Sequence, residues 1–152
     1  MENLYDEYGD WLNGQSYLTN LRVLYYLNGT KYIVLRGGLG RDTAHDAIYA
    51  NWRYSTGIGF GSELPWGFHI YLEPSFIWSN YDGERWVVKN KTFTKLVEQD
   101  FTQRYSMSLS NNKIDIWGFV RTLTFSYTKR DSNIPNRKYE KYTTEFTMSQ
   151  RF

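Results

Sequence analysis

The last twelve residues, 141–152, alternate between polar and apolar side chains, and this pattern limits the fold more than any other feature of the sequence. Every odd position is polar, from Lys141 to Arg151. The even positions include Tyr142, Phe146, Met148 and Phe152. Successive side chains of a β-strand point to opposite faces, so the segment predicts a strand with one polar and one apolar side. Such a strand with an aromatic end is typical of bacterial outer-membrane β-barrels, in which these four residues would also form the signal for barrel assembly.

Comparable patterns recur along the chain and predict about seven strands of roughly 9–14 residues, which meets the 9–11 residues that a tilted membrane strand needs. The expected strands are 17–27, 31–39, 48–61, 68–79, 99–110, 114–128 and 141–152. We therefore expect an all-β fold in which residues 17–152 form an antiparallel, up-and-down transmembrane β-barrel. Residues 1–16 form an N-terminal segment, read as a truncated strand or as an eighth strand.

The expected connections alternate in length. Short turns are predicted at 28–29, 62–67 and 111–113, and long loops at 40–47, 80–98 and 129–140. Outer-membrane barrels have short periplasmic turns and long external loops, so the alternation favours an integral protein of the bacterial outer membrane. Bacterial single-chain barrels have an even number of strands from eight upward, and the sequence starts without a secretory signal. Both points predict the C-terminal part of a larger barrel.

Three local signals carry more specific predictions. Asn28-Gly29 predicts a type I′ hairpin turn, in which both central residues have positive φ. Pro74 lies inside an expected strand and cannot donate a ladder hydrogen bond, so we expect a bulge or a kink there. Arg121 falls on the apolar side of its strand, and the pattern offers no explanation for it.

Composition excludes several classes of protein and of site. The chain has no cysteine, which excludes disulfides and thiolate metal sites. Two histidines make a transition-metal site an unfavourable reading, and no cofactor is expected. The net charge of +2 gives no electrostatic case for nucleic acid. The sequence contains no run of about 18 apolar residues, so no membrane-spanning helix is expected.

The polar sides of the strands form the candidate lumen of the barrel. The expected lumen-facing residues are Arg36, Arg53, His69, Glu73, Asp100, Arg104, Glu145 and Arg151, together with Asn51 and Thr143. They would line a polar conduit or dock a passing chain; alternatively, paired charges simply brace a water-filled wall. Gly57, Gly59 and Gly61 would relieve crowding, admit an inner plug or permit curvature.

Other residues allow two readings each. Trp52, Trp78, Trp86 and Trp117 would belong to aromatic girdles in a membrane barrel, or to the core of a soluble one. His45 with Asp42 and Asp46 is conceivable as a catalytic group near the barrel rim, but a solvated loop is the better reading because spacing does not show convergence. We therefore expect a protein that is not an enzyme.

The stretch from Ile116 to Phe152 resembles the surface lipoprotein assembly modifier family in three features. Gly118-Phe119 followed by residues 123–127 is similar to the family's Gly-Phe-x-Pro-x-Leu strand, although Arg121 replaces the proline. Residues 130–135, with Tyr139 after them, are similar to its Ser-Asn-Ile loop. The third feature is the terminal strand that ends at Phe152.

The resemblance implies a role in moving lipoproteins across the outer membrane to the cell surface. The implied partners are outer-membrane lipid, surface lipoprotein clients and the barrel assembly machinery. The family-like loop supplies the contact candidates Arg130, Asp131, Ser132, Asn133, Ile134 and Pro135, unless it only shapes the rim. The alternatives are a generic porin or adhesin barrel and a soluble lipid-binding β-barrel.

Overall fold

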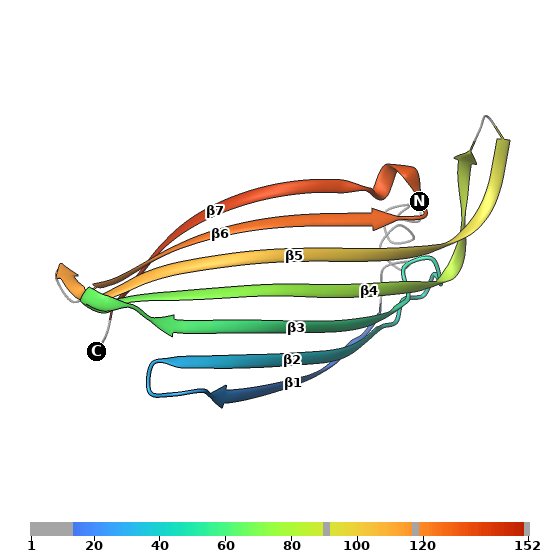
Figure 1. Ribbon diagram of the computed structural model, residues 1–152. Coiled ribbons are helices and arrows are strands. Elements are labelled where there is room, and N and C mark those ends of the chain that lie inside the picture. The colour runs from blue at the N-terminus through green and yellow to red at the C-terminus, as the bar shows by residue number, and fades with distance from the viewer. Residues whose placement is uncertain (1–13, 90–91, 117–118, 151–152) are drawn as a thin grey trace, which may run out of the picture.

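The computed structural model describes residues 14–89, 92–116 and 119–150, which form one antiparallel sheet (Figure 1). Its seven strands are β1 (Ser16–Tyr26), β2 (Lys31–Asp42), β3 (Asn51–Glu63), β4 (Phe68–Lys89), β5 (Thr92–Ile116), β6 (Phe119–Ser132) and β7 (Tyr139–Gln150). Two short 3-10 turns, η2 (Pro65–Gly67) and η3 (Pro135–Arg137), precede β4 and β7. No helix among the described residues is long and apolar enough to cross a membrane.

The strands follow one another in sequence order, from β1 at one edge of the sheet to β7 at the other. Each strand pairs antiparallel with the next, which confirms the all-β, antiparallel, up-and-down fold. The sheet is not closed: β1 and β7 each pair with one strand only (Figure 1). The short connections after β1, β3 and β5 lie at one end of the sheet, here called the short-turn end, and the others lie at the long-connection end.

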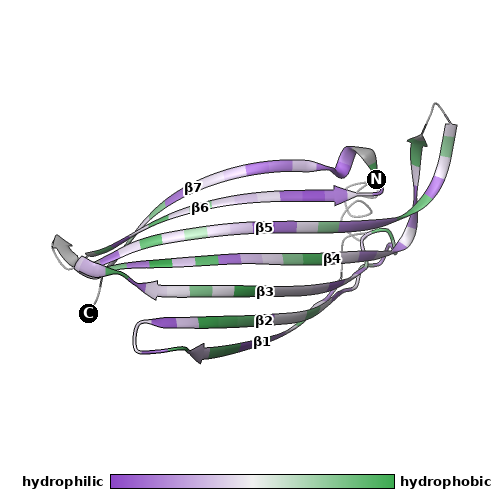
Figure 2. Ribbon diagram, in the orientation of Figure 1, coloured by the Kyte–Doolittle hydropathy of each residue, from purple (hydrophilic) through white to green (hydrophobic). Residues whose placement is uncertain are grey.

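The register sorts the side chains of all seven strands onto two faces. Leu35 pairs with Ile58 and Arg36 with Gly57, so successive residues alternate between the faces. Figure 2 shows the corresponding bands of hydrophilic and hydrophobic residues along β4. The apolar face carries Leu21, Leu35, Ile58, Phe76, Tyr105, Phe125 and Phe146, and the polar face carries Arg36, Arg53, Glu73, Arg104, Ser126 and Thr143. The separation is not complete, because Leu18 and Leu24 of β1, Val34 of β2 and Ile77 of β4 place apolar side chains on the polar face.

The sheet has almost no hydrophobic core. Val34, Ala50 and Ile134 are the buried hydrophobic residues of the described chain. Many large hydrophobic side chains are exposed instead, including Tyr25, Leu35, Ile58, Tyr142 and Phe146. A single sheet packs against nothing on either face, so its apolar face lacks the partner that an ordinary domain provides.

The largest difference from the expected strands concerns the segment 80–98, expected as a loop, because its residues 80–89 and 92–98 belong to strands. β4 and β5 continue as a paired hairpin up to Lys89 and Thr92, and the hairpin projects beyond the rest of the sheet (Figure 1). The register shifts between Asn80 and Glu84, where three residues of β4 lie opposite Glu98. Backbone pairing within the hairpin satisfies the polar main chain, so a strand forms there without a clean alternation of side chains.

Other strand boundaries also differ from those expected from the sequence. The turn expected at 111–113 is wrong, because β5 continues to Ile116, which pairs with Phe119. Residues 129–132 belong to β6 rather than to a loop, and β2 continues to Asp42. β3 starts at Asn51, so Ile48 and Ala50 lie in the preceding connection. Residues 1–13, Trp117, Gly118 and Arg151-Phe152, which carry parts of the expected pattern, lie outside the described residues.

Two turns differ from expectation in their backbone. Neither Asn28 nor Gly29 has positive φ, so the type I′ prediction is wrong. The side-chain Oδ1 of Asn28 instead accepts hydrogen bonds from the backbone N–H groups of Thr30 (2.9 Å) and Lys31 (2.8 Å). This side-chain bonding stabilises a wider loop in which left-handed residues are not needed. In η2, Trp66 (φ 63°) and Gly67 (φ 80°) do adopt positive φ, and the Trp66 side chain is 81% exposed.

The effect of Pro74 is an interruption of the ladder without a bulge. The residue pairs between β3 and β4 stop at Gly57–Ser75 and resume at Phe60–Leu72 with the same register. Pro74 has no N–H to donate toward β3, which explains the local gap. On its other side Pro74 stays in register with Tyr105.

Candidate functional surfaces

The polar face brings together seven of the eight expected lumen-facing residues; Arg151 lies outside the described residues. They fall in two regions of this face. Arg36, Arg53, His69 and Glu73 lie on β2–β4, and Asp100, Arg104 and Glu145 lie on β5–β7. That this face lines a lumen stays a prediction, because the sheet is open.

A polar ledge crosses β3 by passing over its glycines. Nη1 of Arg36 on β2 lies 3.1 Å from Oε1 of Glu73 on β4, and the hydroxyl of Tyr71 donates to the same carboxylate. A Cβ atom at Gly59 would overlap this Tyr71 hydroxyl. The glycine therefore leaves the space through which side chains from two flanking strands meet above the strand between them.

A second contact crosses the same strand closer to the short-turn end. The hydroxyl of Tyr32 on β2 lies 3.0 Å from Nε2 of His69 on β4, and the two rings are stacked with centroids 5.8 Å apart. A Cβ atom at Gly61 would overlap the Tyr32 ring. Of the three roles considered for the glycines, relief of crowding is thus the one with a direct structural basis. We call Tyr32, Arg36, His69, Tyr71 and Glu73 the glycine-spanning ledge.

The other half of the polar face is a field of hydroxyl groups. Serine and threonine occupy most of its positions on β5, β6 and β7, among them Ser106, Ser108, Thr124, Ser126 and Thr143. A hollow of about 420 Å³ lies here and is also lined by Arg104, Lys141 and Glu145. Hydroxyl groups both donate and accept hydrogen bonds, so this surface offers many weak polar contacts and few fixed charges.

The apolar face has charged residues only toward its ends. On β4 its positions are uninterruptedly apolar from Phe68 to Trp78. At the long-connection end Arg41 donates to Asp82 (Nη1 to Oδ1, 2.9 Å), and this hydrogen bond lowers the pKa of Asp82. Lys129 lies 3.9 Å from both Asp131 and Glu140 at the same end.

The predicted aromatic residues of this face occupy different places. Trp52 and Trp78 lie on the apolar face next to the long-connection end, where Trp78 stacks on Phe101 with ring centroids 5.1 Å apart. Trp86 lies on the projecting hairpin and is exposed. Trp66, at the opposite end of the sheet, was missed because it lies in a turn and not in an alternating segment.

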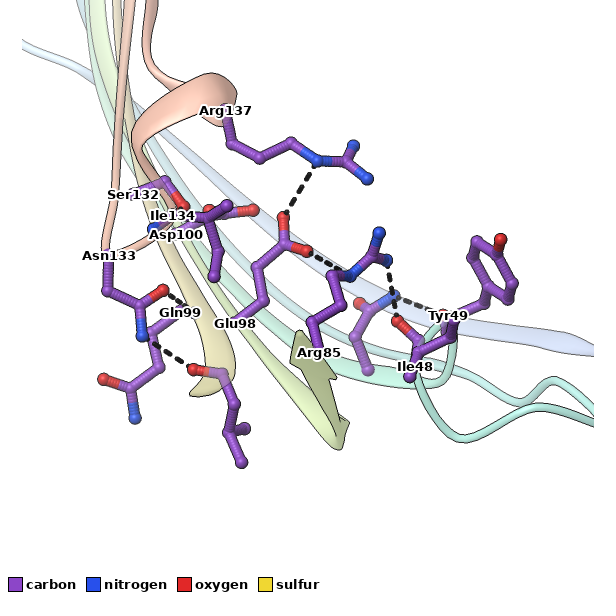
Figure 3. Close-up of polar contacts among 12 residues, drawn as sticks. Ile48, Tyr49, Arg85, Glu98, Gln99, Asp100, Ser132, Asn133, Ile134 and Arg137 are labelled. Carbon is purple, nitrogen blue, oxygen red and sulfur yellow. Dashed lines mark hydrogen bonds and ion pairs between the residues drawn. The ribbon is translucent and has the colours of Figure 1, made fainter. Parts of the chain in front are cut away.

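A buried carboxylate, Glu98, organises the long-connection end (Figure 3). Its side chain is 1% exposed and meets three arginines: Arg85 at 3.1 Å, Arg130 at 3.3 Å and Arg137 at 3.7 Å. Burial, followed by the neighbouring Asp100, raises the pKa of Glu98, while the arginines favour its charged form. The guanidinium groups therefore offset only part of the cost of a carboxylate that is removed from water.

Each arginine of this cluster connects Glu98 to a different segment. Arg137 belongs to η3, and Arg130 on β6 also pairs with Asp100. Arg85 on β4 donates to the backbone oxygen of Ile48 (3.1 Å) and lies over the ring of Tyr49. One buried group thus links the β2–β3 connection, the β4–β5 hairpin and the β6–β7 connection.

The β6–β7 connection is also bound to β5 through Asn133 (Figure 3). Its Oδ1 accepts from the backbone N–H of Gln99 (2.9 Å), and its Nδ2 donates to the carbonyl of Val97 (2.6 Å). The side chain of Asn133 therefore takes the place of a neighbouring strand at the edge of the hairpin. Ser132 contributes by accepting from the backbone N–H of Ile134 (3.1 Å).

The six expected loop contacts are placed mainly inside this arrangement. Ser132 and Ile134 are buried, and Arg130 points its charge into the Glu98 cluster. Asp131 is partly exposed beside Lys129, and nothing is described for the side chain of Pro135. Glu98 and Arg85 were not expected as site residues, because they lie in a segment read as a polar loop.

The remaining expected residues show no convergence of catalytic groups. The carboxylate of Asp42 pairs with Arg53 (2.5 Å) and accepts from Ser16 (2.6 Å), and Asp46 accepts from the backbone N–H of Ile48. Tyr142, Phe146 and Met148 line the apolar face of β7 with exposed side chains. Phe152, the fourth residue of the expected assembly signal, lies outside the described residues.

Comparison with known proteins gives a family for this sheet. The family model described as surface lipoprotein assembly modifier matches residues 1–152. Surface lipoprotein assembly modifier 1 of Haemophilus influenzae is 24% identical over 141 residues, which are 93% of this chain and 28% of that protein. The chain thus spans less than a third of the length of this relative. No solved structure matches the chain. The whole-chain match and the motifs between Ile116 and Phe152 agree, and the chain belongs to the surface lipoprotein assembly modifier family.

Proposed function

We propose that these seven strands form part of the wall of an outer-membrane β-barrel that helps deliver lipoproteins to the cell surface without catalysing a reaction. The observation that carries the proposal is the separation of side chains on the sheet. Its apolar face exposes Leu35, Ile58, Phe125 and Phe146, while its polar face exposes charged and hydroxyl groups. Lipid on one side and a water-filled interior on the other would give both faces suitable surroundings.

The apolar face has the height that a bilayer requires. From Phe68 to Trp78 there are ten residue steps, or roughly 33 Å of strand at ~3.3 Å per residue. At the ~40° tilt of strands in membrane barrels, this length corresponds to a band about 25 Å tall. The ion pairs Arg41–Asp82 and Lys129–Glu140 then lie at one border of the band, where charges remain in contact with water.

The unequal connections support an orientation. Short turns face the periplasm in outer-membrane barrels, so the short-turn end would be periplasmic and the Glu98 cluster extracellular. The open edges at β1 and β7 would pair with strands from the rest of the protein, in line with a relative more than three times as long. The hydroxyl field and the glycine-spanning ledge would then line a conduit or dock a lipoprotein during delivery.

Cysteine labelling tests the membrane wall directly, since this chain contains no cysteine. Single substitutions Arg53→Cys and Ser55→Cys on the polar face are matched by Tyr54→Cys and Ile58→Cys on the apolar face of the same strand. In the full-length protein, otherwise free of cysteine and reconstituted in vesicles, a charged maleimide should react several-fold faster with the first two. Equal rates at all four positions would contradict a wall with lipid on one side.

The delivery role is tested in cells. Cells that contain the full-length protein should display a client lipoprotein in a form that external protease digests, and cells without it should retain the lipoprotein inside. If lipoprotein display is unchanged and the uptake of small solutes falls instead, the protein acts as a porin. If only attachment to surfaces is lost, it acts as an adhesin.

A further inference from the structure

Arg121 is the one arginine on the apolar face at the short-turn end of the described sheet. The register places it on β6 between Asn111 of β5 and Met148 of β7, and Asn111 in turn pairs with Phe68 of β4. The next three positions of this face on β6, Leu123, Phe125 and Tyr127, are apolar. A charged side chain therefore faces the same side as the exposed hydrophobic residues.

The guanidinium group lines a small hollow on this face. The hollow has a volume of about 200 Å³, and its apolar walls are Phe68, Leu109, Leu123 and Phe146, which come from four strands. The uncharged polar residues Ser110 and Asn111 also line it. The Nε atom of Arg121 is buried and has no hydrogen-bond partner among the described residues. An N–H donor in apolar surroundings without an acceptor is costly, so the site is incomplete as described.

The depth of Arg121 decides which acceptor can reach it. An arginine on the lipid face of a membrane barrel costs about 2–4 kcal/mol at the midplane and only about 0–1 kcal/mol near the interface. Arg121 lies level with Phe68, the last apolar position before η2, whose Trp66 is 81% exposed. Tryptophan is enriched at the interface, so this level of the sheet is the headgroup level of the bilayer.

We propose that the hollow at Arg121 binds one glycerophospholipid, with the lipid phosphate on the guanidinium and an acyl chain along Leu123 and Phe146. This inference rests on the proposed membrane wall and adds a specific lipid site to it. The planar guanidinium matches the oxygens of a phosphate, which makes a charge-assisted pair with Arg121. The apolar walls fit a hydrocarbon chain and offer no second charge to a soluble anion.

Native mass spectrometry of the full-length protein in a nonionic detergent tests the site. The probes are dioleoyl phosphatidylglycerol and dioleoylglycerol, which share acyl chains and differ in the phosphoglycerol headgroup. The variants are Arg121→Gln, Arg121→Lys and the control Lys129→Gln, which removes a positive charge from the same face of β6 at its other end. All variants are first checked for the heat-dependent gel migration of a folded barrel.

The wild-type protein should retain phosphatidylglycerol and prefer it to dioleoylglycerol. Arg121→Gln should lower phosphatidylglycerol occupancy about tenfold, as expected for the loss of one charge-assisted hydrogen bond. Arg121→Lys should cause a smaller loss, and Lys129→Gln should change occupancy less than twofold. Retention of dioleoylglycerol should be unaffected by any of them.

Two results would overturn the inference. Equal retention of the two lipids by the wild-type protein excludes a phosphate site and needs no variant, even if Arg121→Gln does not fold. Equal occupancy in wild type and folded Arg121→Gln excludes the assigned residue. Neither result affects the cysteine labelling pattern, so failure of the lipid site is distinguishable from failure of the membrane wall.

Discussion

Replacing Glu98 with alanine is expected to lower the free energy of unfolding by about 3–5 kcal/mol, the cost of removing one partner from a buried ionic cluster. Glu98 is 1% exposed and lies against Arg85, Arg130 and Arg137. Without its carboxylate, Arg130 keeps Asp100 as an acidic partner, while Arg85 and Arg137 lose their ion pair with Glu98. The arginines should then separate, and the connections that they hold should become accessible.

The measurement is urea-induced unfolding of the full-length protein in lipid vesicles, followed by tryptophan fluorescence. Glu84→Ala is the matched control. Glu84 lies on the same hairpin, but it is exposed, and its ion pair with Lys95 is long, at 3.9 Å. An exposed pair of this kind contributes about 0–1 kcal/mol. Limited proteolysis should cut the Glu98→Ala protein in the β6–β7 connection before the wild type. Equal losses in the two variants would show that the cluster does not stabilise this end.

Replacing Gly59 with alanine is expected to destabilise the protein by about 1–3 kcal/mol, because the added methyl group overpacks a filled site. A Cβ atom at Gly59 would overlap the Tyr71 hydroxyl, which donates to Glu73. The Tyr71 ring must move away, and its contacts with Glu73 and Arg36 are lost. The same substitution at Gly37, whose Cβ would meet nothing within 4 Å, is the matched control.

A second substitution should reverse the effect. In the Gly59→Ala background, Tyr71→Ala removes the ring that the methyl group meets, so the double variant should be more stable than the two separate losses predict. Unfolding of the four proteins in the same vesicles gives the coupling energy between the two sites. A coupling energy of zero would mean that Tyr71 does not depend on the space above Gly59.

The strand pattern was predictable because it is local. Successive side chains alternate along any strand, so the polar and apolar faces of segments such as 31–39 and 141–152 followed from residue order alone. The antiparallel order followed from the turns between neighbouring segments. The same reasoning placed Arg36 and Glu73 on one face, without showing that they meet.

The wrong predictions of loops and turns concern segments in which the side-chain pattern does not indicate the backbone conformation. Residues 80–89 and 92–98 pair with each other as a hairpin, although their polar composition is typical of a loop. Asn28 shapes its turn through its side chain, which makes the left-handed backbone of a type I′ turn unnecessary. Residues 111–113 contain typical turn residues and still continue β5.

The sequence by itself determined that this chain makes amphipathic antiparallel strands, because polar and apolar residues alternate along it with a period of two. Only the tertiary structure decided which residues meet across strands. Arg36 reaches Glu73 over a glycine, and Glu98 meets Arg130 from another strand. These contacts depend on register and on one shift near Asn80, and both are set by hydrogen bonds between segments far apart in the chain. The chemistry of each face is therefore a property of the sequence, and the sites on it are properties of the fold.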